Sequence, residues 1–204
     1  LTLYQRFQAE RDFTMAYIGT HLRDDITIDE LYTLHYFEYT KGFDFEGESH
    51  DFWEMVYVDK GEVIVTAGQR ELTLTHGDAF FHYPGQWHTV RSESASNTVI
   101  LSFSCSSPVM DWFYDRMVKA GNTQKKLISS ILSEGMRCFE GPFGDPYSER
   151  LIRKRWAPVG AEQLIRQYLS ELLILFMRNE SDTVQTSSFK NHISDSAFDE
   201  IESF

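Results

Sequence analysis

The chain has 204 residues, a formal net charge of −12, and 42% hydrophobic and 15% aromatic residues, enough to bury one sizeable core and to exclude general disorder. The acidic balance argues against direct contact with nucleic-acid phosphates or an anionic membrane surface, because both require clustered Lys and Arg. No apolar run is long enough to cross a bilayer and residues 1–17 resemble no signal peptide, so we expect a cytoplasmic protein without membrane contact.

Residues 1–22 mix aromatic and charged side chains and predict a strand or an arm, followed by a charged loop at 23–30. Short strands then follow one another, rich in aromatic and β-branched residues and separated by glycine-containing turns. The expected strands are 31–40, 52–58, 62–67, 70–75, 79–83, 88–91 and 98–104, and Asp59-Lys60-Gly61 reads as a hairpin turn between the second and third. This pattern indicates an antiparallel sandwich or barrel.

Helical spacing begins after Pro108. Helices are expected at 109–119 and 123–139, with Leu127, Ile128, Ile131, Leu132 and Met136 on one face of the second, and a short helix is expected at 147–156. The strongest helical pattern, at 160–178, has an apolar face too broad for a helix surrounded by solvent, and a polar linker is expected at 180–188.

Four potential metal ligands or polar pocket residues lie on two of the β segments. Glu48, His50 and Glu54 alternate onto one face of the first segment, and His88 comes from the second. These residue types bind Zn²⁺, Mn²⁺ or Fe²⁺, but they also form hydrogen-bonded polar networks without an ion. Both interpretations stay open, and Glu48, which also reads as a solvated turn carboxylate, is the least certain ligand.

The spacing of these residues is similar to the two motifs of the cupin fold. Gly42, Glu48, His50, Glu54 and Gly61 follow the spacing G-x5-H-x-H-x3-4-E-x6-G, with Glu48 in the position of the first histidine. The second motif, G-x5-P-x-G-x2-H-x3-N, is matched at Gly77, Gly85 and His88, while Tyr83 and Ser92 replace its proline and asparagine. The resemblance implies a mainly β fold with appended α: a cupin-like double-stranded β-helix (jelly-roll) barrel followed by a C-terminal helical dimerisation segment.

The string H-D-F-W-E-M-V-Y-V-D-K-G and the later G-A-E-Q-L-I-R-Q-Y-L-S-E-L-L-I-L-F-M-R resemble the sensor half of AraC-type transcriptional regulators, over roughly residues 30–180. That resemblance implies a small-molecule effector, a homodimer, and DNA binding only through a helix-turn-helix domain that this chain lacks. It also implies that no cofactor is required, because most such sensors have lost the cupin metal. The expected divisions are a barrel with its arm at 1–108, a helical dimerisation segment at 109–179 and a linker or tail at 180–204.

The resemblance also gives candidate residues for binding. A sugar-like polar metabolite is expected in the barrel, against His50, Phe52, Glu54, Val56, Phe80, His82, Trp87 and His88. The dimer interface is expected on the last helix, at Leu164, Tyr168, Leu172 and Leu175. Trp53, Met55 and Tyr57 alternate to the opposite face of their strand and are expected to meet the helices. The rival hypothesis is a stand-alone metal-dependent cupin enzyme.

Overall fold

The computed structural model describes residues 17–148 and 150–185. Most of the predicted N-terminal arm therefore lies outside the described residues, and residues 17–22 form no strand. The tail from residue 186 onward also lies outside them. In the described part of the chain, no helix is both long and apolar enough to span a membrane.

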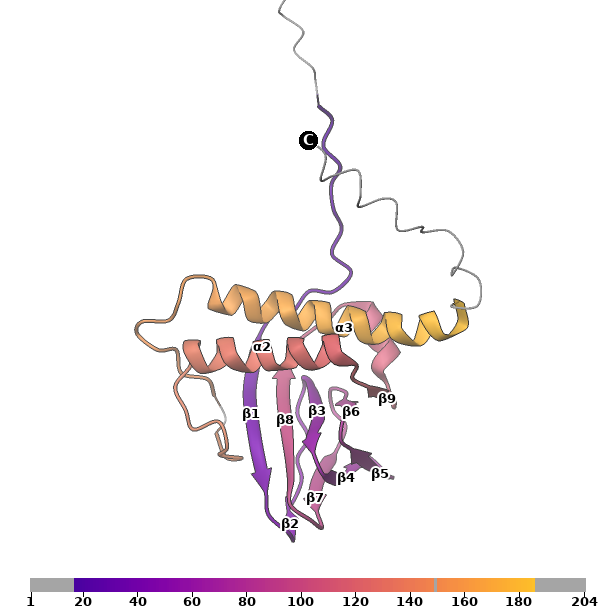
Figure 1. The fold of residues 1–204 in the computed structure, drawn as a ribbon, viewed down its shortest axis with the longest axis vertical. Coiled ribbons are helices and arrows are strands. Elements are labelled where there is room, and N and C mark those ends of the chain that lie inside the picture. The colour runs from indigo at the N-terminus through magenta and orange to yellow at the C-terminus, as the bar shows by residue number, and fades with distance from the viewer. Residues whose placement is uncertain (1–16, 149, 186–204) are drawn as a thin grey trace, which may run out of the picture.

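Two antiparallel sheets form the body of the protein (Figure 1). One has the order β1 (Leu31–Tyr39), β8 (Ser96–Phe103), β3 (Trp53–Lys60), β6 (Asp78–His82) and β9 (Met117–Lys119). The other has the order β2 (Phe43–Asp44), β7 (His88–Ser92), β4 (Glu62–Ala67) and β5 (Arg70–Thr75). The prediction of a mainly β, antiparallel fold with appended helices is confirmed, and its strands form two sheets.

The predicted hairpin at Asp59-Lys60-Gly61 is wrong. Strand β3 pairs with β6 and β8, so both of its edges are already occupied, and β4 pairs in the other sheet with β5 and β7. The turn instead carries the chain from one sheet to the other. Gly61 makes this possible with a φ of 71°, at a point where a Cβ would lie 2.7 Å from the carbonyl oxygen of Ala95.

Both faces of β3 are buried, and each faces a different core. Val56 and Val58 lie between the two sheets, in a cluster that also contains Phe37, Tyr39, Val63, Val65, Ala67, Leu74, Phe80 and Ile100. Trp53, Met55 and Tyr57 lie in the core between the first sheet and the helices, as their alternation predicts. The first sheet is therefore the shared wall between the barrel interior and the helical layer.

The helices α2 (Asn122–Cys138) and α3 (Ala161–Gln185) run side by side across the strands in Figure 1. Ile128 and Ile131 of α2 pack in the same core as Leu169, Leu173 and Phe176 of α3. The predicted helices at 123–139 and 160–178 are thus present, although α3 continues through the first residues of the predicted linker. Met136 is 44% exposed, because the neighbouring Gly135 takes the buried position against Leu34.

Two other helix predictions are wrong. Residues 109–119 form a short 3-10 helix (Pro108–Phe113) and then β9, an edge strand that pairs with β6 and is fixed by an ion pair of 2.9 Å between Lys119 Nζ and Asp78 Oδ1. Residues 147–156 form no helix in their described part. Their backbone instead forms two hydrogen bonds: Lys154 N donates to the carbonyl oxygen of Cys138, the last residue of α2, and Ile152 O accepts from the amide of Glu140 just beyond it.

We predict that Phe81→Ala destabilises the protein by about 3–5 kcal/mol. Phe81 is fully buried, and its ring centroid lies 4.3 Å from that of Phe113 and 6.1 Å from that of Phe176 on α3. The substitution opens a cavity where the sheet meets the helices. Urea unfolding measures the change in the free energy of unfolding. Tyr147 is 82% exposed, so Tyr147→Ala serves as a control that should change this free energy by no more than about 0.5 kcal/mol. A similar effect for both variants would contradict the packing described here.

Candidate functional site

A cavity of about 320 Å³ opens between the two sheets, in the size range of small-molecule sites. It is lined mainly by aromatic, aliphatic, imidazole and carboxylate side chains: Tyr32, Thr33, His35, Phe37, Tyr39, Phe43, Phe45, Glu48, His50, Phe52, Glu54, Val56, His82, His88, Thr89, Val90, Ile100 and Ser102. Pro146 and Ser148, from the connection between α2 and α3, complete the lining. The cavity therefore touches both sheets and the chain segment that leads to the last helix.

Local backbone structure brings Glu48 next to His88. The backbone amides and carbonyls of the two residues form a pair of hydrogen bonds, each 2.9 Å long. Gly47 allows this close approach, because a Cβ there would lie 2.9 Å from the carbonyl oxygen of His88 in a backbone with φ of 103°. Glu54 comes from the middle of the first sheet, where it pairs with His82 on one side and Ser102 on the other.

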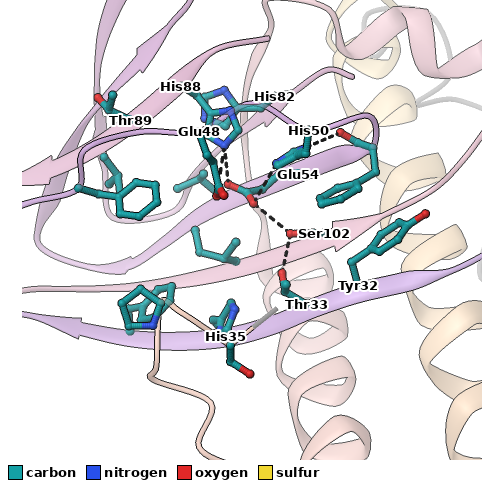
Figure 2. Close-up of a pocket in the computed structure, with 18 of the residues that line it drawn as sticks. Tyr32, Thr33, His35, Glu48, His50, Glu54, His82, His88, Thr89 and Ser102 are labelled. Atoms are coloured by element: carbon teal, nitrogen blue, oxygen red, sulfur yellow. Dashed lines mark hydrogen bonds and ion pairs between the residues drawn. The ribbon is translucent and has the colours of Figure 1, made fainter. Parts of the chain in front are cut away.

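The four predicted ligands meet at one point (Figure 2). Glu48, His50, Glu54 and His88 each offer one atom, and these atoms all lie within 4.8 Å of one another. Glu54 Oε2 lies 3.6 Å from His50 Nε2, and Glu54 Oε1 lies 3.4 Å from His88 Nε2. His88 Nε2 is also 3.8 Å from a Glu48 oxygen. Of these four residues only Glu48 is substantially exposed, so the cluster is closed on the protein side and open toward the cavity.

Backbone carbonyls set the tautomers of the two histidines. His50 Nδ1 lies 3.0 Å from the carbonyl oxygen of Phe52, and His88 Nδ1 lies 3.0 Å from that of Gln86. A carbonyl only accepts hydrogen bonds, so each Nδ1 carries the hydrogen and each neutral ring presents the Nε2 lone pair to Glu54. Both Nε2 atoms are buried without a hydrogen-bond partner. Acceptors thus face acceptors, and the arrangement needs a proton or another cation between them.

The electrostatics of the cluster follow from this arrangement. Burial alone would raise the pKa of Glu54, but its close contacts with the His50 and His88 rings outweigh burial and place the pKa well below its usual value. Burial likewise opposes protonation of His88, yet the contact with Glu54 wins and raises the His88 pKa. Burial, together with repulsion from Glu54, raises the pKa of Glu48. In the absence of another cation, the cluster therefore favours a proton on His88.

A hydroxyl relay supports Glu54 from the opposite side. Ser102 Oγ donates a 3.0 Å hydrogen bond to a Glu54 oxygen, and the Thr33 hydroxyl lies 2.5 Å from Ser102 Oγ (Figure 2). Glu54 is only 7% exposed, and a buried carboxylate destabilises the fold unless hydrogen bonds or a positive charge compensate for its lost hydration. The relay fixes the direction in which Glu54 presents its charge, toward the two imidazoles and the cavity.

His82 is a third imidazole at the site, stacked on His88 with ring centroids 4.2 Å apart. Its Nδ1 lies 3.0 Å from Gln86 Oε1, and its Nε2 is buried without a partner. Burial and the neighbouring positive charge of His88 lower the pKa of His82 to about 4. His82 therefore stays neutral near pH 7 and adds one more lone pair to the cluster.

The donor set fits a divalent cation. Two imidazole nitrogens with backbone-fixed tautomers and two carboxylates match the ligand types of Zn²⁺, Mn²⁺ and Fe²⁺, and the orphaned Nε2 atoms are the observation that supports the fit. His50, Glu54 and His88 would hold such an ion, with Glu48 at the cavity mouth as the fourth ligand. A bound ion would supply Lewis acidity and a coordination position for a ligand's donor atom.

Six of the eight pocket residues predicted from the sequence line the cavity: His50, Phe52, Glu54, Val56, His82 and His88. Phe80 does not, because it is fully buried in the core between the sheets, and Trp87 does not, because its turn leaves it 50% exposed. The contribution of β1, above all of Tyr32, His35 and Tyr39, was not predicted. The alternating aromatic residues of that strand were the available signal.

The predicted interface residues differ in exposure. Leu164, Tyr168 and Leu175 are partly buried on α3, whereas Leu172 is fully buried in the protein's own core and has no surface to offer a partner. Leu172 faces inward because it belongs to a buried stripe along the helix, with residues three or four positions apart. The other members of this stripe are Ile165, Leu169 and Phe176.

Residues 30–119 match the AraC-like ligand binding domain. No curated protein matches the chain. Among solved structures, the chain is similar to a cupin superfamily protein from Desulfitobacterium hafniense (11% identity, TM-score 0.35, covering 42% of this chain and 84% of that one). It is also similar to an RmlC-like cupin from Shewanella frigidimarina (17% identity, TM-score 0.34, covering 46% of this chain and 96% of that one). A third similar structure is a predicted oxalate decarboxylase from Thermotoga maritima (14% identity, TM-score 0.35, covering 36% of this chain and 67% of that one).

We propose that the ion-free protein binds one Zn²⁺ or Mn²⁺ per chain at this cluster. His88→Ala should weaken binding at least about tenfold, because it removes a ligand that contacts both carboxylates. Isothermal titration calorimetry after treatment with a chelator measures this, with the exposed His21→Ala as a matched control. No ion binding by the wild-type protein would instead identify the cluster as a network that shares a proton.

Acidification should destabilise the protein partly through His82. Its pKa is about 4 when folded and near 6.5 when unfolded, so the unfolded chain binds the extra proton first and stability is lost as the pH falls from 6.5 to 4. The full effect is about 3 kcal/mol. Urea unfolding of His82→Phe in the presence of a chelator should show a shallower loss over this window than the wild type. Parallel profiles would contradict the assignment.

Proposed function

We propose that this chain is the effector-sensing and dimerisation part of an AraC-type transcription regulator, with DNA bound by a helix-turn-helix domain beyond this sequence. The observation that carries the proposal is the position of the cavity. All of its lining residues except Pro146 and Ser148 fall within residues 30–119, the segment that matches the AraC-like ligand binding domain. A small metabolite in the cavity is the effector, and the sugar-like class predicted from the sequence is one candidate.

The connection between α2 and α3 provides a route from the cavity to the last helix. The carbonyl oxygen of Phe143 accepts a hydrogen bond of 2.9 Å from Tyr36 N and lies 3.3 Å from Nδ1 of His35, a cavity residue. Further along, Arg153 forms a two-point ion pair with Glu162 in the first turn of α3. An effector that contacts Pro146 or Ser148 therefore acts on a segment tied to both the barrel and α3.

Regulation then follows from a difference in affinity. An effector that binds one arrangement of this connection more tightly shifts the population toward it, and coupling of about 1–3 kcal/mol changes DNA affinity roughly 5- to 150-fold. We propose that α3 forms a homodimer through Leu164, Tyr168 and Leu175, so that the shift moves the two DNA-binding domains relative to each other. The regulator would work in the cytoplasm and without catalysis.

A metal-dependent enzyme is the alternative. The cluster of imidazoles and carboxylates fits an ion, as such an enzyme requires. The same groups also suit a binding site, with or without an ion, and the match to a ligand-binding domain favours the sensor.

Fusion of the chain to a heterologous DNA-binding domain that is active only as a dimer tests the proposal. The fusion should repress a reporter, and Tyr168→Glu should abolish repression by placing a charge on the half-buried face of α3. Gln167→Glu, which adds the same charge at the exposed neighbouring position, should leave repression unchanged. Equal repression by all three fusions would contradict dimerisation through this helix.

The same reporter tests sensing. At least one metabolite in a chemically diverse panel should change repression, and the effect should be lost in Val90→Trp, which fills the cavity from β7. Size-exclusion chromatography with light scattering verifies that this variant still dimerises. A response that persists in Val90→Trp would place the effector elsewhere.

A further inference from the structure

Two rows of stacked rings line the cavity. In the first row, Phe52 has Tyr32 on one face and His50 on the other, with ring centroids 4.1 and 3.8 Å away and interplanar angles of 15° and 10°. Both faces of the Phe52 ring are therefore occupied by other rings, and it presents its C–H edge to a ligand.

The second row follows β1 and reaches β2. Phe37 lies between His35 and Tyr39, at 4.8 and 5.4 Å, and Tyr39 in turn stacks on Phe43 at 4.2 Å, all with interplanar angles near 20°. Phe37 and Tyr39 thus also have a ring on each face. Because these residues line the cavity, its second aromatic surface also consists mainly of ring edges.

Ring edges select a particular kind of ligand. The edge of an aromatic ring is electrically positive and its face is negative, so an edge favours the π face of another ring in a T-shaped contact. A sugar packs its C–H groups, which are also positive, against ring faces, and here the faces of Phe37, Tyr39 and Phe52 are already covered. The cavity therefore favours a planar aromatic ring over a sugar.

The charges of the cavity select the other end of the ligand. Its described lining includes two carboxylates, Glu48 and Glu54, and no Lys or Arg. The Nε2 atoms of His50 and His82 are buried without hydrogen-bond partners, and they add lone pairs to the same region. Figure 2 shows Glu48, Glu54 and His88 gathered on one side of the cavity, across from His35. An ammonium group would find acceptors there, whereas an anion would find no cationic side chain of Lys or Arg in the described lining.

The size of the cavity suits a small ligand that contains an aromatic ring. An apolar cavity of about 150 Å³ holds a benzene molecule, so about 320 Å³ accommodates one ring with a short chain.

We propose that the effector of the ion-free protein is a small aromatic amine, whose ring lies against the ring edges and whose ammonium group lies at Glu48 and Glu54 in place of a divalent ion. This inference rests on the proposed sensing function and narrows its ligand class. Glu48 is the specificity-determining group at the cavity mouth, because its side chain is half exposed and already faces His88 Nε2 at 3.8 Å.

Calorimetric titration of the chelator-treated chain with four probes tests the proposal. 2-Phenylethylamine should bind, and 2-cyclohexylethylamine, which keeps the amine but lacks the π face, should bind about 3- to 10-fold more weakly. Phenylacetate, which keeps the ring but carries a negative charge, should bind at least about 100-fold more weakly. Glucose should also bind at least about tenfold more weakly than the amine, since the ring faces are covered.

A pair of variants locates the charge. Glu48→Gln should weaken binding of 2-phenylethylamine about 3- to 10-fold, and Glu46→Gln, an exposed residue outside the cavity lining, should leave it within about twofold. Equal weakening in both variants would overturn the placement of the ammonium group.

Binding of glucose or phenylacetate as tight as that of the amine would overturn the ligand class, as would failure of all four probes to bind. Neither result would contradict the proposed sensing function. A reporter response to another metabolite that is lost in Val90→Trp would still show that the cavity senses an effector. If no metabolite in the panel changed repression, the sensing function itself would be contradicted.

Discussion

The structure of the site depends on one buried carboxylate between two imidazoles. Glu54 is 7% exposed, and its oxygens lie 3.4 and 3.6 Å from the Nε2 atoms of His88 and His50. Backbone carbonyls hold the hydrogens of both rings on Nδ1, so the two Nε2 atoms carry lone pairs. These lone pairs face the Glu54 carboxylate, which offers them no hydrogen-bond donor. The site is therefore stabilised by a bound positive charge, which can be a proton, a divalent ion or an ammonium group.

Much of the packing of the fold keeps this carboxylate in place. Strand β3 holds Glu54 at the centre of the first sheet, between β6 and β8, and its neighbours on the opposite face anchor the helices. On the inner side, the valines and phenylalanines between the sheets fill one part of the barrel and leave the cavity in the other. Rigid sheets can hold the Glu54 carboxylate and the imidazole lone pairs close together although these groups repel one another. Such repulsion lowers the stability of the folded protein, a cost that commonly accompanies a binding site.

Much of this arrangement could be predicted from the sequence. The strands and the longer helices followed from period and turn residues, and the spacing of His50, Glu54 and His88 placed them in one cluster. The hairpin at Gly61 could not be rejected locally, because its outcome depends on which edges of β3 are taken by distant strands. Phe80 lies outside the cavity lining because strand alternation gives two faces without saying which part of the interior stays open. Trp87 lies in the connection before β7, where strand alternation gives no guide to the direction of its side chain.

The central role of the Glu54 charge is tested most directly by calorimetric titration of a divalent ion and of 2-phenylethylamine, separately, into the chelator-treated wild-type chain and Glu54→Gln. Glutamine keeps the shape and an acceptor for the Ser102 hydroxyl, but removes the charge. We expect the wild type to bind the positively charged probes and the folded variant to bind each at least about 100-fold more weakly. Binding of equal affinity by a folded Glu54→Gln would show that the buried charge is not what the site uses.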